Sequence, residues 1–82
     1  MTPENKRRKS ILLSIALEPG MGVKKIRHEL EFVHFIAASH DVVRADLLWL
    51  SELGLVKFAD DTAMATERGI DIAQSRAEFP GE

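Results

Sequence analysis

The stretch SHDVVRADLLWLSELGLV, residues Ser39–Val56, decides the fold. Ser39 is a residue type that commonly caps the start of a helix, and Gly54 is placed to end one. Between them, apolar side chains recur at helical spacing and form one broad face, with Trp49 at its edge. That face consists of Val42, Val43, Leu47, Leu50 and Leu53. The stretch therefore predicts a helix over about 39–53, followed directly by a strand.

The length and composition of the chain indicate one small globular domain. Eighty-two residues, 45% hydrophobic and 29% charged, are ordinary for a single folded domain. We expect this domain to span 1–82, with a frayed tail over about 78–82. The chain has no cysteine, which excludes disulfides and thiolate metal sites. No apolar run approaches membrane-spanning length, so we expect a cytoplasmic protein.

Two further helices are predicted before Ser39. The sequence TPEN offers a cap, a proline suited to the first turn and an acidic residue favoured by the helix dipole. This first helix should end at EPGMG, residues 18–22, where Pro19 and Gly20 break the pattern. A second helix should begin near Val23. Its end is open, because FVHFIAAS can continue as helix or contain a turn and a short extended piece.

A hairpin and a last helix are predicted after Gly54. LVKFA and TAMAT read as two short strands, joined by a turn at Asp60 and Asp61. Thr66 then caps a final helix, TERGIDIAQSRAEF. The predicted fold is mainly α with a small β-hairpin, in the order helix, helix, helix, strand, strand, helix.

This pattern resembles the winged helix-turn-helix domains of ArsR-, MarR- and DeoR-like transcription factors. The resemblance covers about residues 8–75 and is carried by Val43, Arg44, Asp46, Leu47, Leu50, Gly54, Leu55, Val56, Thr66 and Gly69. A narrower resemblance is to small stand-alone winged-helix proteins of Mu-like phages and prophages. These end in a similar tail, here Arg76, Ala77, Pro80 and Gly81. The resemblance implies a homodimeric transcription regulator acting in the cytoplasm of a bacterial host cell.

Charge is distributed unevenly along the chain. Residues 1–44 carry eight basic and five acidic side chains, a net charge of +3, whereas residues 45–82 carry three basic and eight acidic ones, a net charge of −5. A basic first half is compatible with a nucleic-acid-binding face. It is equally compatible with an ordinary solvated surface, and both interpretations stay open.

The resemblance implies that the helix over about 39–53 lies in the major groove of double-stranded DNA. Its first turns would then contact the DNA through Ser39, His40, Asp41 and Arg44. Arg44 is the strongest candidate, because a guanidinium can bind a guanine edge or a phosphate. The alternative is a surface arginine that pairs with Asp41 or Glu52.

Two basic clusters are candidates for phosphate contacts. Lys24 and Lys25 open the second helix, and Arg7 and Arg8 belong to NKRRK in the first. A solvated helix surface explains these clusters equally well.

Asp46 stands in the middle of the apolar face of the third helix. A carboxylate in such a place is unfavourable unless it is paired. We expect a structural ion pair with a basic residue of the first or second helix, Arg8 or Arg27.

Other features favour contacts with proteins over contacts with DNA. The predicted hairpin tip, Asp60 and Asp61, is acidic and would repel a phosphate backbone. The alternative function is therefore a winged-helix interaction or assembly module that does not bind DNA. Phe32, Phe35 and Ile36 form a candidate dimer interface.

We expect no enzyme activity, cofactor or metal site. No nucleophile–base pair, phosphate-binding glycine loop or pair of carboxylates at a working spacing is present. The three histidines, His28, His34 and His40, are six residues apart and do not share a helix face.

Overall fold

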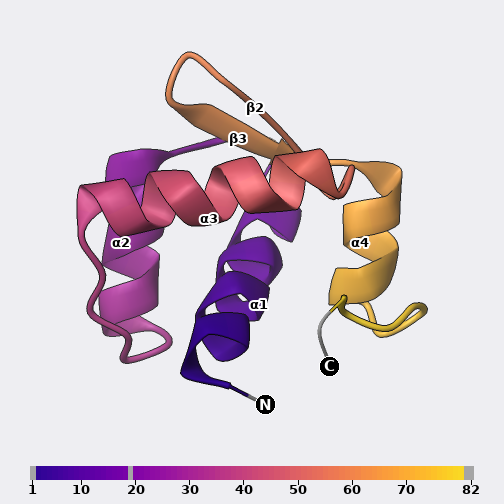
Figure 1. Ribbon diagram of the computed structural model, residues 1–82, viewed down its shortest axis with the longest axis horizontal. Coiled ribbons are helices and arrows are strands. Elements are labelled where there is room, and N and C mark those ends of the chain that lie inside the picture. Colours follow the sequence, from indigo (N-terminus) through magenta and orange to yellow (C-terminus); the bar gives the residue numbers. More distant parts are fainter. Residues whose placement is uncertain (1, 19, 81–82) are drawn as a thin grey trace.

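The described residues form four helices and a three-stranded antiparallel sheet (Figure 1). The computed structural model describes residues 2–18 and 20–80. In chain order, its elements are α1 (Pro3–Ala16), β1 (Met21–Gly22), α2 (Val23–Phe32), α3 (His40–Glu52), β2 (Val56–Ala59), β3 (Thr62–Ala65) and α4 (Glu67–Ala73). The predicted mainly α fold with a small hairpin is confirmed, and this arrangement is compatible with a winged helix-turn-helix domain.

Helix α3 organises the molecule. In Figure 1 it lies across α1 and α2, with the β2–β3 hairpin along one side and α4 near its C-terminal end. Helix α3 contacts α1, α2 and β2. The stretch that predicted the fold is thus packed against two helices and one strand.

Hydroxyl side chains cap three of the helices, as the sequence predicts. Thr2 accepts a hydrogen bond from the Asn5 backbone at 3.1 Å. Ser39 accepts one from Val42 at 3.2 Å, and Thr66 accepts one from Gly69 at 3.1 Å. Each bond satisfies an N–H that has no partner within its helix, which explains why these helices begin where they do.

Gly54 ends α3 through a left-handed turn, with φ of +75°. The Leu55 N–H donates to the Leu50 carbonyl at 3.0 Å, and the Gly54 N–H donates to the Ser51 carbonyl at 3.0 Å. These two bonds form a Schellman motif, which satisfies carbonyls left unpaired at the end of the helix. The predicted glycine stop is confirmed.

The end of α2, which the sequence left open, is a turn and not a continued helix. Helix α2 ends at Phe32, and Phe35 adopts φ of +59°, an uncommon conformation for a residue with a side chain. This turn brings the Ile36 N–H within 2.8 Å of the Leu30 carbonyl. The chain then runs without helix to the cap at Ser39.

The sheet has a third strand that the sequence analysis missed. Met21 and Gly22, expected only to follow the end of a helix, pair with Ala63 and Thr62 as β1. The strand order is β1–β3–β2, so β3 is central. Two residues cannot show the alternation by which strands are recognised, and their pairing is non-local. Pro19, expected to help end the first helix, lies outside the described residues.

The hairpin turns at Asp60 and Asp61, as predicted, and the length of the loop, which the sequence left open, is two residues. Asp60 and Asp61 adopt φ of +52° and +59°. Positive values at both positions are typical of the turn whose twist matches that of paired strands, and aspartate tolerates them better than most residues.

The core joins apolar side chains from every helix and strand. Its fully buried members include Ile11, Leu12, Ile15, Ile26, Leu30, Val43, Leu47, Leu50 and Leu55. The sequence placed Val42 on the buried apolar face of α3, and this prediction is wrong. Val42 is 37% exposed, because the buried side of α3 runs through Val43, Asp46, Leu47 and Leu50 instead.

The predicted frayed tail is wrong for Phe79. Helix α4 ends at Ala73, earlier than the sequence suggested, and the chain turns at Ser75 with φ of +61°. Phe79 is 2% exposed and its ring centre lies 6.1 Å from that of Trp49. Trp49 is partly buried and packs against the core, so these two aromatic rings close one end of the domain. Residues 81–82 lie outside the described part.

Among the described residues, no helix is long and apolar enough to cross a membrane.

Candidate nucleic-acid interface

The start of α3 presents polar side chains to solvent. His40 and Arg44 keep 46% and 42% of their side chains exposed. Ser39, Asp41 and Ala45 are also exposed. The core uses the opposite side of the helix, so this first stretch of α3 is available for contacts with another molecule.

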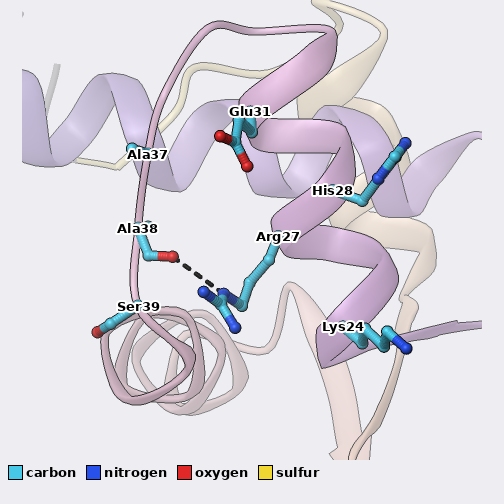
Figure 2. Close-up of a pocket in the computed structure, with 7 residues that line it drawn as sticks. All are labelled: Lys24, Arg27, His28, Glu31, Ala37, Ala38 and Ser39. Carbon is cyan, nitrogen blue, oxygen red and sulfur yellow. Dashed lines mark hydrogen bonds between the residues drawn. The ribbon is translucent and has the colours of Figure 1, made fainter.

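An open hollow of about 530 Å³ lies beside the start of α3. Its lining comes from α2 and from the segment before α3: Lys24, Arg27, His28, Glu31, Ala37, Ala38 and Ser39. Figure 2 shows Arg27 reaching toward Ala38 and Ser39, while Lys24 and His28 extend from the other side of α2. At this hollow, Arg27 is the basic group of α2 that approaches the cap of α3.

Arg27 holds the segment that leads into α3. Its Nε donates to the Ala38 carbonyl at 3.0 Å, next to the capping residue Ser39 (Figure 2). The expectation that Arg27 pairs with Asp46 is wrong, since its guanidinium is turned to this backbone carbonyl. This contact positions the start of α3 and leaves other guanidinium N–H groups free to face the hollow.

Asp46 is buried between two arginines of α1. Its side chain is 1% exposed, and Arg7 Nη2 lies 2.9 Å from Oδ1. Arg7 Nε donates to Oδ2, and Arg8 Nε lies 3.0 Å from Oδ1. The predicted structural ion pair is confirmed for Arg8, while the part played by Arg7 was missed.

The charge on Arg7 is stabilised by this contact. The hydrogen bond to Asp46 raises the pKa of the Arg7 guanidinium, and the nearby negative charges of Asp46 and Glu4 add to that effect. Partial burial acts in the opposite direction. Arg8 also lies with Cζ 4.2 Å from the centre of the Trp49 ring, which adds a cation–π contact to the packing of α1 on α3.

Arg7 and Arg8 are therefore not free phosphate contacts. Their side chains are 22% and 17% exposed, and both are bonded to the buried Asp46. The NKRRK cluster looked like a basic surface in sequence, but two of its members fix the packing of α1 on α3. Removing them from Asp46 to bind DNA would leave a buried carboxylate unpaired.

Arg44 has a partner that neither sequence interpretation named. Its Nη1 bonds Asp61 Oδ1 at the hairpin tip, and not Asp41 or Glu52. His40 Nε2 lies 3.8 Å from the other carboxylate oxygen of Asp61. Arg44 Cζ also lies 5.4 Å from the centre of the Phe58 ring. The hairpin thus places an acidic side chain against the two most basic exposed groups of α3.

The two lysines at the start of α2 differ in their surroundings. Lys25 Nζ lies 2.8 and 2.7 Å from the two carboxylate oxygens of Glu18, so its charge is matched within the chain. Lys24 is exposed and borders the hollow beside α3. Of these two lysines, Lys24 is the better candidate for a phosphate contact, because its charge is not matched by Glu18.

The three candidate dimer residues also differ in exposure. Phe32 and Phe35 are 62% and 86% exposed, and Val33 beside them is 57% exposed. Ile36 is partly buried and packs against the core, so its side chain contributes less to a free surface. The turn after α2 therefore carries a small exposed apolar patch of Phe32, Val33 and Phe35.

In the described part of the chain, no three histidine, cysteine or acidic residues come together as a metal site would require. His34 Nε2 is instead 3.1 Å from Ser14 Oγ, in a contact between the α2–α3 connection and α1.

Comparison of the chain with protein-family models, with curated proteins and with solved structures gives no match. Any assignment of function therefore depends on the residues of this chain alone.

Proposed function

We propose that the protein binds double-stranded DNA, with the start of α3 in the major groove, and regulates transcription. The observation that carries this proposal is the exposure of His40 and Arg44 in the first turns of α3, with Arg27 of α2 bonded to the segment that leads into this helix. Lys24 borders the hollow that Arg27 also lines. Helices of this kind insert their first turns into the groove, while neighbouring basic groups hold the backbone.

The chemistry of each group suits a different part of a duplex. The Arg44 guanidinium can bind O6 and N7 of a guanine, or a phosphate. Lys24 and Arg27 line the hollow next to the start of α3, and in a complex they would supply charge for the phosphates without reading sequence. Ala45, one position further along α3, is small and exposed and would let the groove edge approach closely.

A dimer would strengthen binding to a site with two similar halves. The exposed patch of Phe32, Val33 and Phe35 is apolar surface that a second copy of the chain would cover. A two-fold dimer places its two recognition helices about one DNA turn apart. The resemblance to small proteins of Mu-like phages and prophages adds the proposal that this regulator belongs to a phage or prophage.

A second function, a protein-interaction module without DNA binding, is favoured by one observation. Asp61 neutralises Arg44 and stands beside His40, so the exposed side of α3 is less basic than its sequence suggests. In this alternative the same surface would bind a protein partner, and duplex DNA would be ignored.

Salt-dependent binding to a labelled duplex separates the two functions. With two to three phosphate contacts, we expect the logarithm of affinity to fall with that of salt concentration at a slope of about −2 to −3. Lys24→Ala should weaken binding to all sequences alike and reduce this slope by about one.

Arg76→Ala is the matched control. Arg76 follows the end of α4, is 62% exposed and pairs with Asp71 at 2.9 Å. Its replacement removes one positive charge at a position outside α2 and α3. We expect it to leave affinity nearly unchanged. An absence of duplex binding at micromolar protein and low salt would contradict the DNA function and favour the interaction module.

A further inference from the structure

We propose that Asp61, at the tip of the β2–β3 hairpin, is a built-in competitor of DNA for Arg44. The carboxylate occupies the guanidinium that would bind a phosphate or a guanine edge, and so sets how strongly the protein holds DNA. This inference rests on the proposed DNA function and adds an autoinhibitory contact to it.

The contact is made by the groups that DNA would use. Asp61 Oδ1 is bonded to Arg44 Nη1, and Oδ2 stands 3.8 Å from His40 Nε2. An anionic oxygen therefore meets both basic side chains in the first turns of α3. A DNA phosphate presents the same chemistry to the same two groups, so the carboxylate and DNA compete for Arg44.

The hairpin tip is held in this position by the third strand. Thr62 pairs with Gly22, and the Val23 N–H donates to the Asp61 carbonyl at 3.2 Å. The backbone of Asp61 is therefore fastened to the start of α2 and does not swing freely. Because α2 packs on α3, this anchor holds the backbone of Asp61 close to α3.

The competition is weak enough to be reversed by DNA. The side chains of Arg44 and Asp61 are 42% and 53% exposed. Exposed ion pairs of this kind change an equilibrium by up to about fivefold, and salt weakens them further. A duplex that supplies several phosphates can therefore displace Asp61, while a single anion competes poorly. The fixed acidic tip would also repel the DNA backbone until Arg44 is released.

Asp61→Asn tests this inference by removing the charge and keeping the turn. Asparagine accepts the positive φ of this position, so the hairpin should stay intact. We expect affinity for a labelled duplex to rise about threefold to tenfold at low salt. The gain should shrink toward none as salt is raised, because screening already weakens the Arg44–Asp61 contact in the unchanged protein.

Asp60→Asn is the matched control, since it changes the same charge at the adjacent turn position. Among the ion pairs of the described residues, Arg44 and His40 are paired with Asp61 and not with Asp60. We therefore expect a clearly smaller gain from Asp60→Asn. In an Arg44→Ala background, Asp61→Asn should lose most of its effect, because the competitor then has little to release.

The outcomes separate this inference from the function on which it rests. The inference is overturned if Asp60→Asn and Asp61→Asn raise the affinity equally, or if Asp61→Asn raises it undiminished in the Arg44→Ala background. Either result would mean that the affinity depends on the net charge of the protein and not on the Arg44–Asp61 contact. A loss of affinity on Asp61→Asn would overturn it too, because Asp61 would then support Arg44. In each of these cases the unchanged protein still binds DNA. If no variant binds a duplex, the DNA function itself is wrong.

Discussion

Arg7 and Asp46 form the ion pair that joins α1 to α3, with Arg7 bonded to both oxygens of a carboxylate that is 1% exposed. Arg8 completes the shell around that carboxylate and stacks on Trp49. Two adjacent arginines of α1 thus hold a buried acidic side chain of α3 between the two helices. Such a pair is sensitive to the loss of either charge, because the remaining one stays partly buried.

Asp46→Ala should destabilise the fold by about 2–3 kcal/mol, since it leaves Arg7 and Arg8 without their shared acceptor. The midpoint of urea unfolding measures this loss. Glu52→Ala, an exposed acidic position on the same helix, is the control and should stay within about 0.5 kcal/mol of the unchanged protein. Equal stabilities of the two variants would contradict a structural role for Asp46.

The charge of Arg7 should support the fold over the whole ordinary pH range. Its pKa is raised in the folded state by the hydrogen bond to Asp46. A raised pKa contributes stability that is fully present below the unfolded-state value and is lost only as pH rises through the folded-state value. For arginine both values lie in strong alkali, so unfolding from pH 7 to about pH 9 should show no loss from this group. A steep decline in that range that disappears in Arg7→Ala would be inconsistent with this assignment.

Phe79→Ala should destabilise the fold by about 3 kcal/mol, because it empties a buried site against Trp49. Trp49 is the only tryptophan, so its fluorescence reports this site directly and should shift toward that of an exposed indole. Phe35→Ala removes the same side chain from a position that is 86% exposed. We expect it to leave the stability of the monomer nearly unchanged. A frayed tail would instead make Phe79→Ala the harmless variant.

Gly69→Ala should destabilise the fold by about 1–3 kcal/mol through overpacking. A Cβ at Gly69 would run into the Leu55 carbonyl oxygen, and it would lie 3.2 Å from Leu12 Cδ1. Gly22→Ala is the control, because a Cβ there would meet the Asp61 carbonyl oxygen at an ordinary 3.7 Å. Thermal unfolding that ranks the Gly22 variant below the Gly69 variant would show that α4 does not pack on Leu55 as described.

The parts of the fold that were predictable from sequence are those set by neighbouring residues. Ser39, Thr66 and Gly54 act within one helical turn of their own positions, so their residue types are informative by themselves. The same holds for the position of the turn at Asp60 and Asp61, although not for its length. A hydrogen bond between residues close in sequence can therefore be predicted from the residue types at those positions.

The parts that sequence reasoning missed depend on contacts between distant residues. Strand β1 exists only because Met21 and Gly22 meet β3, about forty residues later. The Arg44–Asp61 contact follows from that pairing, and the burial of Phe79 follows from a turn after α4. From the sequence we expected Arg8 or Arg27 to pair with Asp46 and did not include Arg7, whereas Asp46 is bonded to both Arg7 and Arg8.

The sequence identified exposed side chains at the start of α3 but not the charged groups that surround them. His40 and Arg44 are exposed at the start of α3, as the resemblance implied. The sequence could not reveal that Arg7 and Arg8 are committed to Asp46, or that Asp61 faces Arg44. Both corrections reduce the free positive charge near α3 and concentrate the DNA proposal on Arg44, Lys24 and Arg27.

The most direct test of the central claim is a titration of a labelled duplex with the unchanged protein and with Arg44→Ala, repeated over a range of salt concentrations. We predict salt-dependent binding that Arg44→Ala weakens by about tenfold, which corresponds to one good contact to a base or phosphate. If Arg44 contacts a phosphate, its loss should also make the salt dependence shallower by about one. Identical binding curves for the two proteins, or no binding at low salt, would contradict the proposal that α3 binds DNA through Arg44.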